Sequence, residues 1–338
     1  MRRTSQPKVC VIGAGAIGGF FGARLGARPA SGHAMVSAVA RGATLEALCT
    51  RGWVLESSTG ERIVAPVRAV ADPKELGPQD IVIITVKAHA LADIAPLVAP
   101  LLGPSTIVVP AVNGVPWWFT LGGAMPIAGR LRSVDPHGAL EAAIPTACVI
   151  GAAIYPACSS PEPGVTKHTS GSKLVFGEIG PDARPDARLE TLIALLRSAG
   201  FDAQPSAQIR TEVWKKLVGN ACFNPVSLIT GSATDRMIDD PAIYELFTTM
   251  MNETLAVGRA LGIDAELQPA DRMALTRKLG KVKTSMLQDA EAGRAVELDA
   301  ILGAVNELAE KLGVTTPANR IVYGLAQMRA QTFGLLKV

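Results

Sequence analysis

The sequence predicts an α/β protein with an N-terminal doubly wound parallel sheet and an all-helical C-terminal domain. In the first half, short apolar runs that stop at glycine or proline alternate with segments of helical spacing. This pattern is typical of strands buried on both faces and joined by helices. Beyond about residue 185 the apolar residues recur at helical spacing, and prolines and glycines separate the segments. A length of 338 residues also favours two domains.

The first predicted element is a strand at 8–12 (KVCVI), which ends at glycine and leads into a helix over 15–27. We expect a second helix at 43–50. Further strands are predicted at 34–40, 81–86, 106–110, 147–155, 164–168 and 173–177.

The C-terminal part is predicted to be helical over 186–199, 207–230, 241–261, 269–280, 284–292, 299–312 and 317–331. The segment GEIGPDARPDAR (177–188) reads as an exposed, turn-rich link. The sequence therefore predicts one domain over 1–184 and a second over 185–338.

Composition excludes several classes of protein. A net charge of +3 with interspersed signs offers no basic stripe for nucleic acid. The five cysteines are scattered without a C-x-x-C pair, which favours reduced thiols and no metal site. The N-terminus lacks a signal-peptide core, and no apolar run reaches the ~18 residues of a membrane span. We expect a cytoplasmic protein.

The stretch GAGAIG follows the first strand and opens the first helix, with glycines in the G-x-G-x-x-G spacing. The first glycine permits a turn, the second lets the backbone approach a pyrophosphate, and the third packs helix on strand. The spacing predicts a Rossmann-type dinucleotide site, with a purely structural turn as the alternative. Its residues are Gly13, Ala14, Gly15, Ala16, Ile17 and Gly18.

Arg41 follows the second predicted strand, where an NAD-binding site would carry Asp or Glu. A guanidinium suits a 2′-phosphate through charge-assisted, bidentate hydrogen bonds, so the predicted cofactor is NADPH. The long GARPASGHAM segment (26–35) between Gly18 and Arg41 leaves the register of the arginine open. A surface arginine is the alternative.

The stretch WKKLVGNACFNP (214–225) places Lys216, Asn220 and Asn224 at i, i+4 and i+8. At 3.6 residues per turn these positions drift by only about 40° per step, so they share one helix face. Burying an amine or amide without a partner costs roughly 1–3 kcal/mol, so something polar must meet this face.

Six segments in order resemble the 2-dehydropantoate 2-reductase (ketopantoate reductase) family over essentially the whole chain: GAGAIGGFFGARL, VARG, TVKAHAL, NGV, WKKLVGNACFNP and TSMLQDAEAGRAVELD. The resemblance implies a Rossmann domain followed by a helical domain, with the reactive carbonyl between them. It also implies NADPH-dependent reduction of a 2-oxo acid, ketopantoate to pantoate, in pantothenate biosynthesis.

The resemblance implies that Lys216 is the catalytic lysine and that Asn220 and Asn224 accompany it. It assigns Lys87 and Asn113 to the surroundings of nicotinamide and substrate. An ammonium placed at the reacting ketone can stabilise the developing negative charge and deliver a proton. This chemistry explains why a polar face would interrupt a buried helix.

Ser285 and Glu297 match the substrate-contacting serine and acid of the family. Each assignment has a structural alternative: a Glu212–Lys216 ion pair with Lys215 as the better solvent-facing partner, a kink at Asn224–Pro225, a turn at Asn113–Gly114, a surface Lys87, a cap at Ser285 and a solvated Glu297.

The sequence departs from the family at Val112 and Val282, where polar residues are usual, and carries Trp117 and Trp118 after the NG pair. The tryptophans either line a more apolar substrate site or pack a core. These departures leave open a reductase of a different, more apolar 2-oxo acid, a non-catalytic NADP-binding module or a related NADP-dependent hydroxy-acid or opine dehydrogenase. A homodimer is a further possibility for the helical domain.

Overall fold

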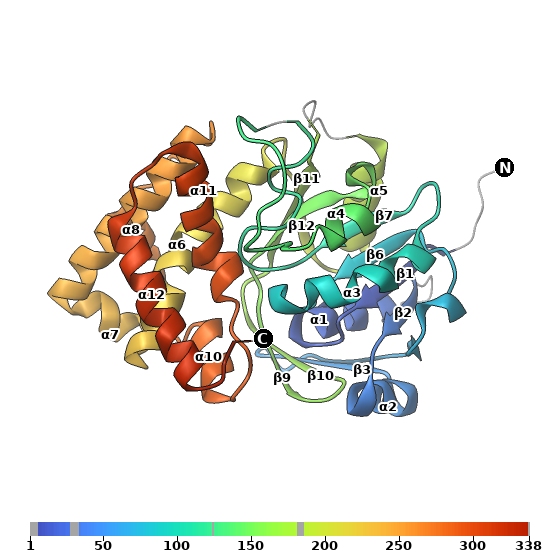
Figure 1. Ribbon diagram of the computed structural model, residues 1–338. Coiled ribbons are helices and arrows are strands. Elements are labelled where there is room, and N and C mark those ends of the chain that lie inside the picture. The colour runs from blue at the N-terminus through green and yellow to red at the C-terminus, as the bar shows by residue number, and fades with distance from the viewer. Residues whose placement is uncertain (1–5, 28–33, 124, 181–185, 337–338) are drawn as a thin grey trace. The chain divides into compact units, whose positions relative to one another are not determined.

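The computed structural model describes residues 6–27, 34–123, 125–180 and 186–336, and the chain divides into two compact units. Unit 1 comprises Met1–Val112 and Ala139–Ile209, and unit 2 comprises Asn113–Gly138 and Arg210–Val338. Figure 1 shows the elements of both units.

Unit 1 is built on a five-stranded sheet in the order β5-β2-β1-β6-β7, in which every neighbouring pair is parallel. Figure 1 shows β1, β2, β6 and β7 together near the N-terminal part of the chain. The sheet strands are β1 (Lys8–Ile12), β2 (Met35–Val39), β5 (Arg68–Val70), β6 (Ile81–Ile84) and β7 (Ile107–Pro110). Both β6 and β7 are buried at every residue, as expected for strands covered on two faces.

Two smaller sheets complete unit 1. One has the order β4-β3-β10-β9 and the other the order β12-β11-β8. Their strands are β3 (Trp53–Ser57), β4 (Arg62–Ala65), β8 (Ile150–Ile154), β9 (Ala157–Glu162), β10 (Val165–Ser170), β11 (Lys173–Glu178) and β12 (Asp202–Pro205). The helices of unit 1 are α1 (Ala16–Gly26), α2 (Gly42–Arg51), α3 (Leu91–Val98), α4 (Ala139–Ala143) and α5 (Ala187–Ser198).

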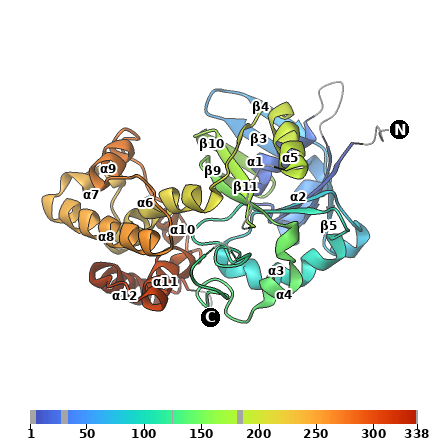
Figure 2. The same cartoon turned by 90° about the horizontal axis from the view of Figure 1, so that it is seen from above.

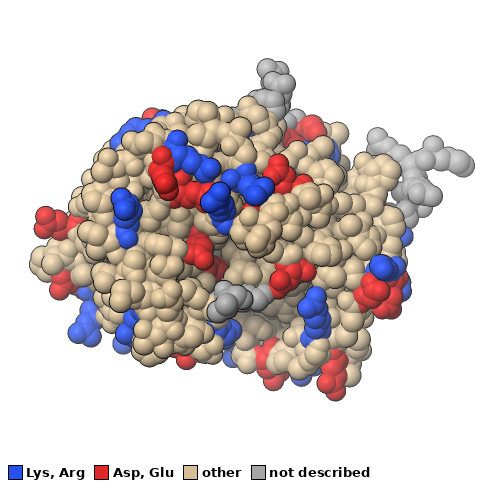
Figure 3. All heavy atoms as spheres, in the orientation of Figure 1, with Lys and Arg blue, Asp and Glu red and all other residues tan. Residues whose placement is uncertain are grey.

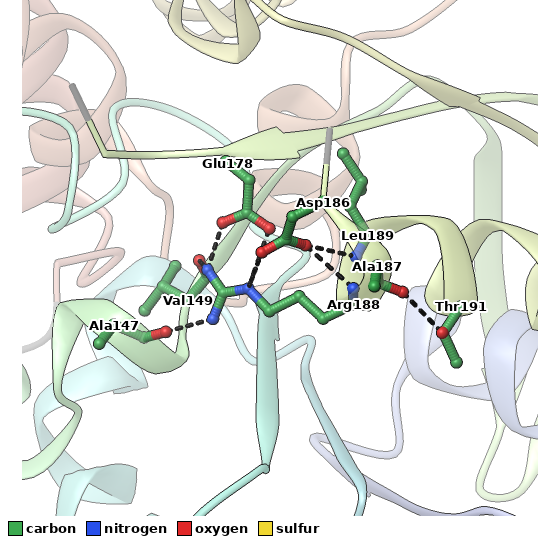
Figure 4. Close-up of polar contacts among 8 residues, drawn as sticks. All are labelled: Ala147, Val149, Glu178, Asp186, Ala187, Arg188, Leu189 and Thr191. Carbon is green, nitrogen blue, oxygen red and sulfur yellow. Dashed lines mark hydrogen bonds and ion pairs between the residues drawn. The ribbon is translucent and has the colours of Figure 1, made fainter. Parts of the chain in front are cut away.

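The start of α5 is fixed by an ion pair inside unit 1 (Figure 4). Arg188 donates from Nε to Glu178 Oε1 at 2.9 Å and from Nη2 to the second carboxylate oxygen, while Nη1 donates to the carbonyl of Ala147. Asp186 caps the helix by accepting from the amides of Arg188 and Leu189 at 3.0 and 3.1 Å. The pair stabilises the charge on Arg188 and raises the pKa of its guanidinium above the ordinary value.

Unit 2 is a helical assembly around α8 (Pro241–Ala260), which packs against α7, α9, α11 and α12. Figure 2 shows α8 between the pair α7 and α9 and the pair α11 and α12. The other helices are α6 (Ile209–Thr230), α7 (Thr234–Asp239), α9 (Pro269–Arg277), α10 (Ser285–Glu291), α11 (Ala304–Leu312) and α12 (Pro317–Thr332), with a π-helical turn at Asp299–Gly303 before α11.

The predicted fold class is confirmed, and the predicted strands and most helices appear within a few residues of their expected ends. Three features differ. The strands β3, β4, β5, β9 and β12 were not expected because their sequences are short and rich in polar residues. Helix α7 is also an addition, and 299–303 forms a π-helical turn instead of α-helix.

The division into units does not follow the predicted boundary at 184/185, which lies outside the described residues. Residues 187–205 pack with unit 1, because β12 pairs in parallel with β11 and α5 covers both strands. Residues 113–138 pack with unit 2 instead of continuing the sheet domain. The GARPASGHAM segment of the sequence analysis also lies largely outside the described residues, at 28–33.

None of the helices that the structure describes is long and apolar enough to cross a membrane. On the face drawn in Figure 3, the basic and acidic side chains of the described residues are interspersed.

Candidate active site

The glycine loop after β1 has the backbone geometry that a phosphate-binding turn requires. Gly13 has φ +99°, and a Cβ there would lie 2.7 Å from the backbone nitrogen of Val86. A Cβ on Gly18 would lie 2.0 Å from the carbonyl oxygen of Gly13, so only glycine lets α1 approach the strand. Thr85 Oγ1 donates to that same carbonyl at 2.5 Å and holds the turn in place.

Gly15 differs from the other two glycines because a Cβ on it would meet nothing within 4 Å. It also caps α1 without a side-chain hydrogen bond, so the first amides of the helix are available to an anion. Ala14 and Ile17 pack against the core of unit 1 and fix the loop from below. The residues of this loop therefore fit the pyrophosphate of a dinucleotide.

Arg41 lies at the same edge of the sheet as this loop. Ile12 is the register partner of both Val39 and Ile84, so the chain leaves β1, β2 and β6 side by side at their carboxyl ends. Arg41 follows β2, precedes α2 and is exposed, while Lys87 follows β6 and is half-buried. This edge is where doubly wound sheets bind nucleotides.

In unit 2, Lys216 on α6 donates from Nζ to Asn113 Oδ1 at 2.7 Å. Burial lowers the pKa of Lys216 from its ordinary value near 10.5 to about 8, and the negative charge of Glu297 opposes this shift. Glu297 is itself buried, with 6% of its surface exposed. Three residues that are distant in sequence thus meet at one amine.

The alternative ion pair for Lys216 is not the one that forms. Glu212 Oε1 lies 3.7 Å from Nζ of Lys215, the neighbouring lysine that the sequence analysis named as the better partner. Lys216 instead points its amine at Asn113.

Asn220 and Asn224 lie on the same helix as Lys216, which continues unbroken through Pro225 to Thr230. Asn224 is 4% exposed, and its Nδ2 has no hydrogen-bond partner among the described residues. A buried, unsatisfied amide donor is costly and requires an explanation, of which a bound acceptor is one. The start of α10 reaches this end of α6, because Ser227 and Thr284 share a hydrogen bond of 2.5 Å.

Ser285 is the first residue of α10 and is exposed. The helix cap is the preceding Thr284, whose side chain accepts from the amide of Leu287 at 3.2 Å. The expectation that Ser285 might act only as a cap is therefore wrong.

The segment after Asn113 is held by contacts that the sequence analysis missed. Trp117 and Trp118 are 1% and 0% exposed, which supports the packing alternative for both tryptophans. Arg210 on α6 donates to the carbonyls of Phe119 and Leu121 at 2.8 and 2.7 Å and lies over the Trp118 ring. An arginine at the start of a helix gives no signal that it holds a loop 89 residues away.

The structure thus brings the predicted residues together in two groups. Unit 1 gathers the glycine loop, Arg41 and Lys87, and unit 2 gathers Lys216, Asn113 and Glu297. No group of three or more His, Cys, Asp or Glu side chains in the described part of the chain is arranged to hold a metal ion.

Comparisons with known proteins agree with this arrangement. The family model "Ketopantoate reductase PanE/ApbA" matches residues 9–181, and "Ketopantoate reductase PanE/ApbA C terminal" matches residues 208–330. The 2-dehydropantoate 2-reductase of Mesorhizobium japonicum is 41% identical over 96% of this chain and 98% of its own.

Among solved structures, a protein from Ralstonia solanacearum MolK2 described as a ketopantoate reductase is 42% identical, with a TM-score of 0.91 over 98% of this chain and 100% of that one. A D-mandelate dehydrogenase solved with NADH and anilino(oxo)acetate has a TM-score of 0.79 over 98% and 100% of the two chains. At 21% identity, that likeness shows the fold alone. From the two family models and the relatives of more than 40% identity, we conclude that the chain belongs to the ketopantoate reductase family and is an oxidoreductase.

Proposed function

We propose that the protein reduces 2-dehydropantoate (ketopantoate) to pantoate with NADPH, as a step of pantothenate biosynthesis. The observation that carries this proposal is the buried Lys216, whose amine is hydrogen-bonded to Asn113, influenced by Glu297 and lowered in pKa to about 8. Family membership supplies the class of reaction, and this amine supplies a chemical means of carrying it out.

Lys216 is the proposed proton donor. Negative charge develops on the ketone oxygen as hydride reaches the carbonyl carbon, and an ammonium placed there stabilises that charge. A pKa of about 8 keeps the amine largely protonated at neutral pH while making the proton easier to release than at 10.5. Asn113 takes one of the three ammonium hydrogens and leaves the others for substrate.

The remaining polar residues are proposed to bind the 2-oxo acid. Asn224 has a buried Nδ2 without a partner, which suits a carboxylate or hydroxyl oxygen of the substrate. Asn220 follows Lys216 by one turn on the same face, and the exposed Ser285 begins α10. Glu297 is proposed to accept from a substrate hydroxyl, and Lys87 to attract its carboxylate.

NADPH, when bound, supplies the hydride. The loop Gly13, Ala14, Gly15, Ala16, Ile17 and Gly18 is proposed to hold its pyrophosphate. The exposed Arg41 guanidinium is proposed to bind the 2′-phosphate, because it lies beside the loop and no acidic side chain takes the position that would favour NAD. Lys87 and Asn113 are the further residues assigned to the cofactor.

The test is oxidation of NADPH with ketopantoate, followed by absorbance, for wild type, Lys216→Ala and Lys215→Ala. We expect Lys216→Ala to lower kcat by roughly 10²–10⁴-fold, the usual contribution of a positioned acid. Lys215→Ala is the matched control, since it removes an adjacent lysine whose ion pair is with Glu212. Equal activity of Lys216→Ala and wild type would refute the role of this lysine.

Cofactor preference is tested in the same assay with NADH and with Arg41→Ala. We expect the KM for NADPH to rise at least about tenfold in Arg41→Ala with little change for NADH, because only NADPH carries the phosphate. Arg62→Ala, which removes an exposed arginine of β4, is the control. If ketopantoate is inert while phenylglyoxylate is reduced, the substrate is a more apolar 2-oxo acid.

The homodimer stays a prediction. Light scattering on the purified protein decides between one and two copies.

A further inference from the structure

The helix that contains α11 begins with an irregular turn. In the π-helical turn Asp299–Gly303, the amide of Ala304 donates to the carbonyl of Asp299, five residues back. In an α-helix that amide would use the carbonyl of Ala300. The Ala300 carbonyl instead accepts from the amide of Val115 at 2.7 Å.

This contact seats the Asn113–Val115 segment on the turn. Gly114 has φ +80°, and a Cβ on it would lie 2.4 Å from the carbonyl oxygen of Ala300 and 2.7 Å from its carbon. Both atoms belong to the backbone, so the turn could not yield by moving a flexible side chain. Asn113, the hydrogen-bond acceptor of Lys216, is therefore fixed directly beside a point of backbone contact.

Helix α12 braces the turn from another direction. Tyr323 donates its hydroxyl to Asp299 Oδ1 at 2.6 Å. A Cβ on Gly303 would lie 3.1 Å from the Tyr323 ring, so the ring rests closely on the turn. Glu297, whose charge acts on Lys216, precedes Asp299 by two residues and enters this same turn.

We infer that the π-helical turn Asp299–Gly303 positions the proton donor, with Gly114 and Tyr323 as positioning residues that act through Asn113 and Glu297. A helix that incorporated the Ala300 carbonyl into a regular α-helical bond would release Val115 and with it Asn113. π-helical turns are rare and occur often at functional sites, which fits this role. The inference rests on the proposed function of Lys216.

The test compares two variants with two matched controls. Gly114→Ala introduces the backbone clash, and Gly129→Ala places the same methyl at φ +88° in the same segment with nothing within 4 Å. Tyr323→Phe removes the hydrogen bond to Asp299 and keeps the ring, and Tyr244→Phe removes a hydroxyl from α8. The rate is measured from pH 6 to 10 at saturating NADPH and 2-oxo acid.

We expect Gly114→Ala to lower kcat about tenfold or more and Tyr323→Phe about threefold, with smaller changes in KM. The pH at which kcat falls by half should move to lower values in both, because the ammonium loses support from Asn113 or Glu297. The controls should keep the wild-type midpoint. The same midpoints should appear in ligand-free protein when Lys216 is titrated by NMR of ¹³C-dimethylated lysines.

A midpoint that stays at the wild-type value in Tyr323→Phe would overturn the inference, even if the amount of active enzyme drops. If Gly114→Ala does not fold, Tyr323→Phe alone decides. Full activity of Lys216→Ala would instead refute the proposed function, so the two failures are distinguishable.

Discussion

At the scale of single residues, Lys216 is unusual because its amine is buried and yet lies among polar groups that favour its charge. As the proton donor it must be protonated, and its pKa is about 8. We therefore expect kcat to be high below pH 8 and to fall as the pH rises through 8. Lys216→Arg should lose this decline together with most of the rate, because a guanidinium stays protonated.

The control for this profile is Lys215→Ala, which should decline at the same pH as wild type. A wild-type rate that stays level to pH 10 would contradict a lysine donor with this pKa. Steady-state measurement of kcat at saturating substrate gives the answer directly.

Two buried asparagines of unit 2 offer a second comparison. Asn224 has an Nδ2 without a partner among the described residues, whereas Asn319 donates to Thr254 Oγ1 and to the carbonyl of Met250 at 3.2 and 3.3 Å. Asn224→Leu should leave the free energy of unfolding unchanged or raise it by about 1 kcal/mol, and should increase the KM for the 2-oxo acid. Asn319→Leu should cost roughly 1–3 kcal/mol without changing KM.

Urea unfolding and steady-state kinetics on the same preparations check both expectations. A strong loss of stability in Asn224→Leu would show that its amide is satisfied within the protein and that no ligand is needed to explain it.

Residues with a local signal were predictable from sequence. The glycine loop has a fixed spacing, and Lys216 stands on a patterned helix face. The hydrogen bond between Lys216 and Asn113 joins residues 103 positions apart, and nothing in either local sequence specifies it. Gly114 reads as an ordinary turn residue, because its constraint is the distant carbonyl of Ala300.

At the scale of elements, the ion pair between Arg188 and Glu178 joins α5 to β11. Side-chain exposures of 31% for the arginine and 9% for the glutamate make this a partly buried pair. Arg188→Met should lower the free energy of unfolding by roughly 2–3 kcal/mol, because it leaves a buried carboxylate uncompensated. Arg62→Met is the control, since its ion pair with Glu56 is exposed and 3.9 Å long and should contribute under about 0.5 kcal/mol.

Urea denaturation of the two variants measures the difference. Adding Glu178→Leu to Arg188→Met should recover most of the loss, and no recovery would mean that the arginine acts through its backbone carbonyl contacts instead. Neither variant should change the pH dependence of kcat, because both pairs lie in unit 1.

The same scale explains which elements the sequence could reveal. The central strands are continuous apolar runs and were predictable, whereas β12 (DAQP) is polar and ends in proline. It forms because β11 offers a parallel partner and α5 covers it. The π-helical turn is equally hidden, because LDAILGAV has the composition of an ordinary helix.

At the scale of the whole molecule, the chain passes between the two units at 112/113, at 138/139 and at 209/210. The segment 113–138 carries Asn113, both buried tryptophans and the carbonyls that Arg210 binds, and all of its partners belong to unit 2. A single cut at 184/185 would therefore separate Arg210, which is 8% exposed, from its acceptors. It would also strip α5 and β12 from β11.

This topology predicts how fragments behave. Residues 1–209 retain α5, β12 and the Arg188–Glu178 pair, whereas residues 1–184 lose all three. Because α5 buries Leu189, Leu192 and Leu196 in the core of unit 1, we expect only the longer fragment to unfold cooperatively in urea and to bind NADPH. Circular dichroism and NADPH fluorescence measure the two properties, with the full chain as reference. Cooperative unfolding of 1–184 with NADPH affinity equal to that of 1–209 would show that the sheet with its glycine loop is complete without α5 and β12.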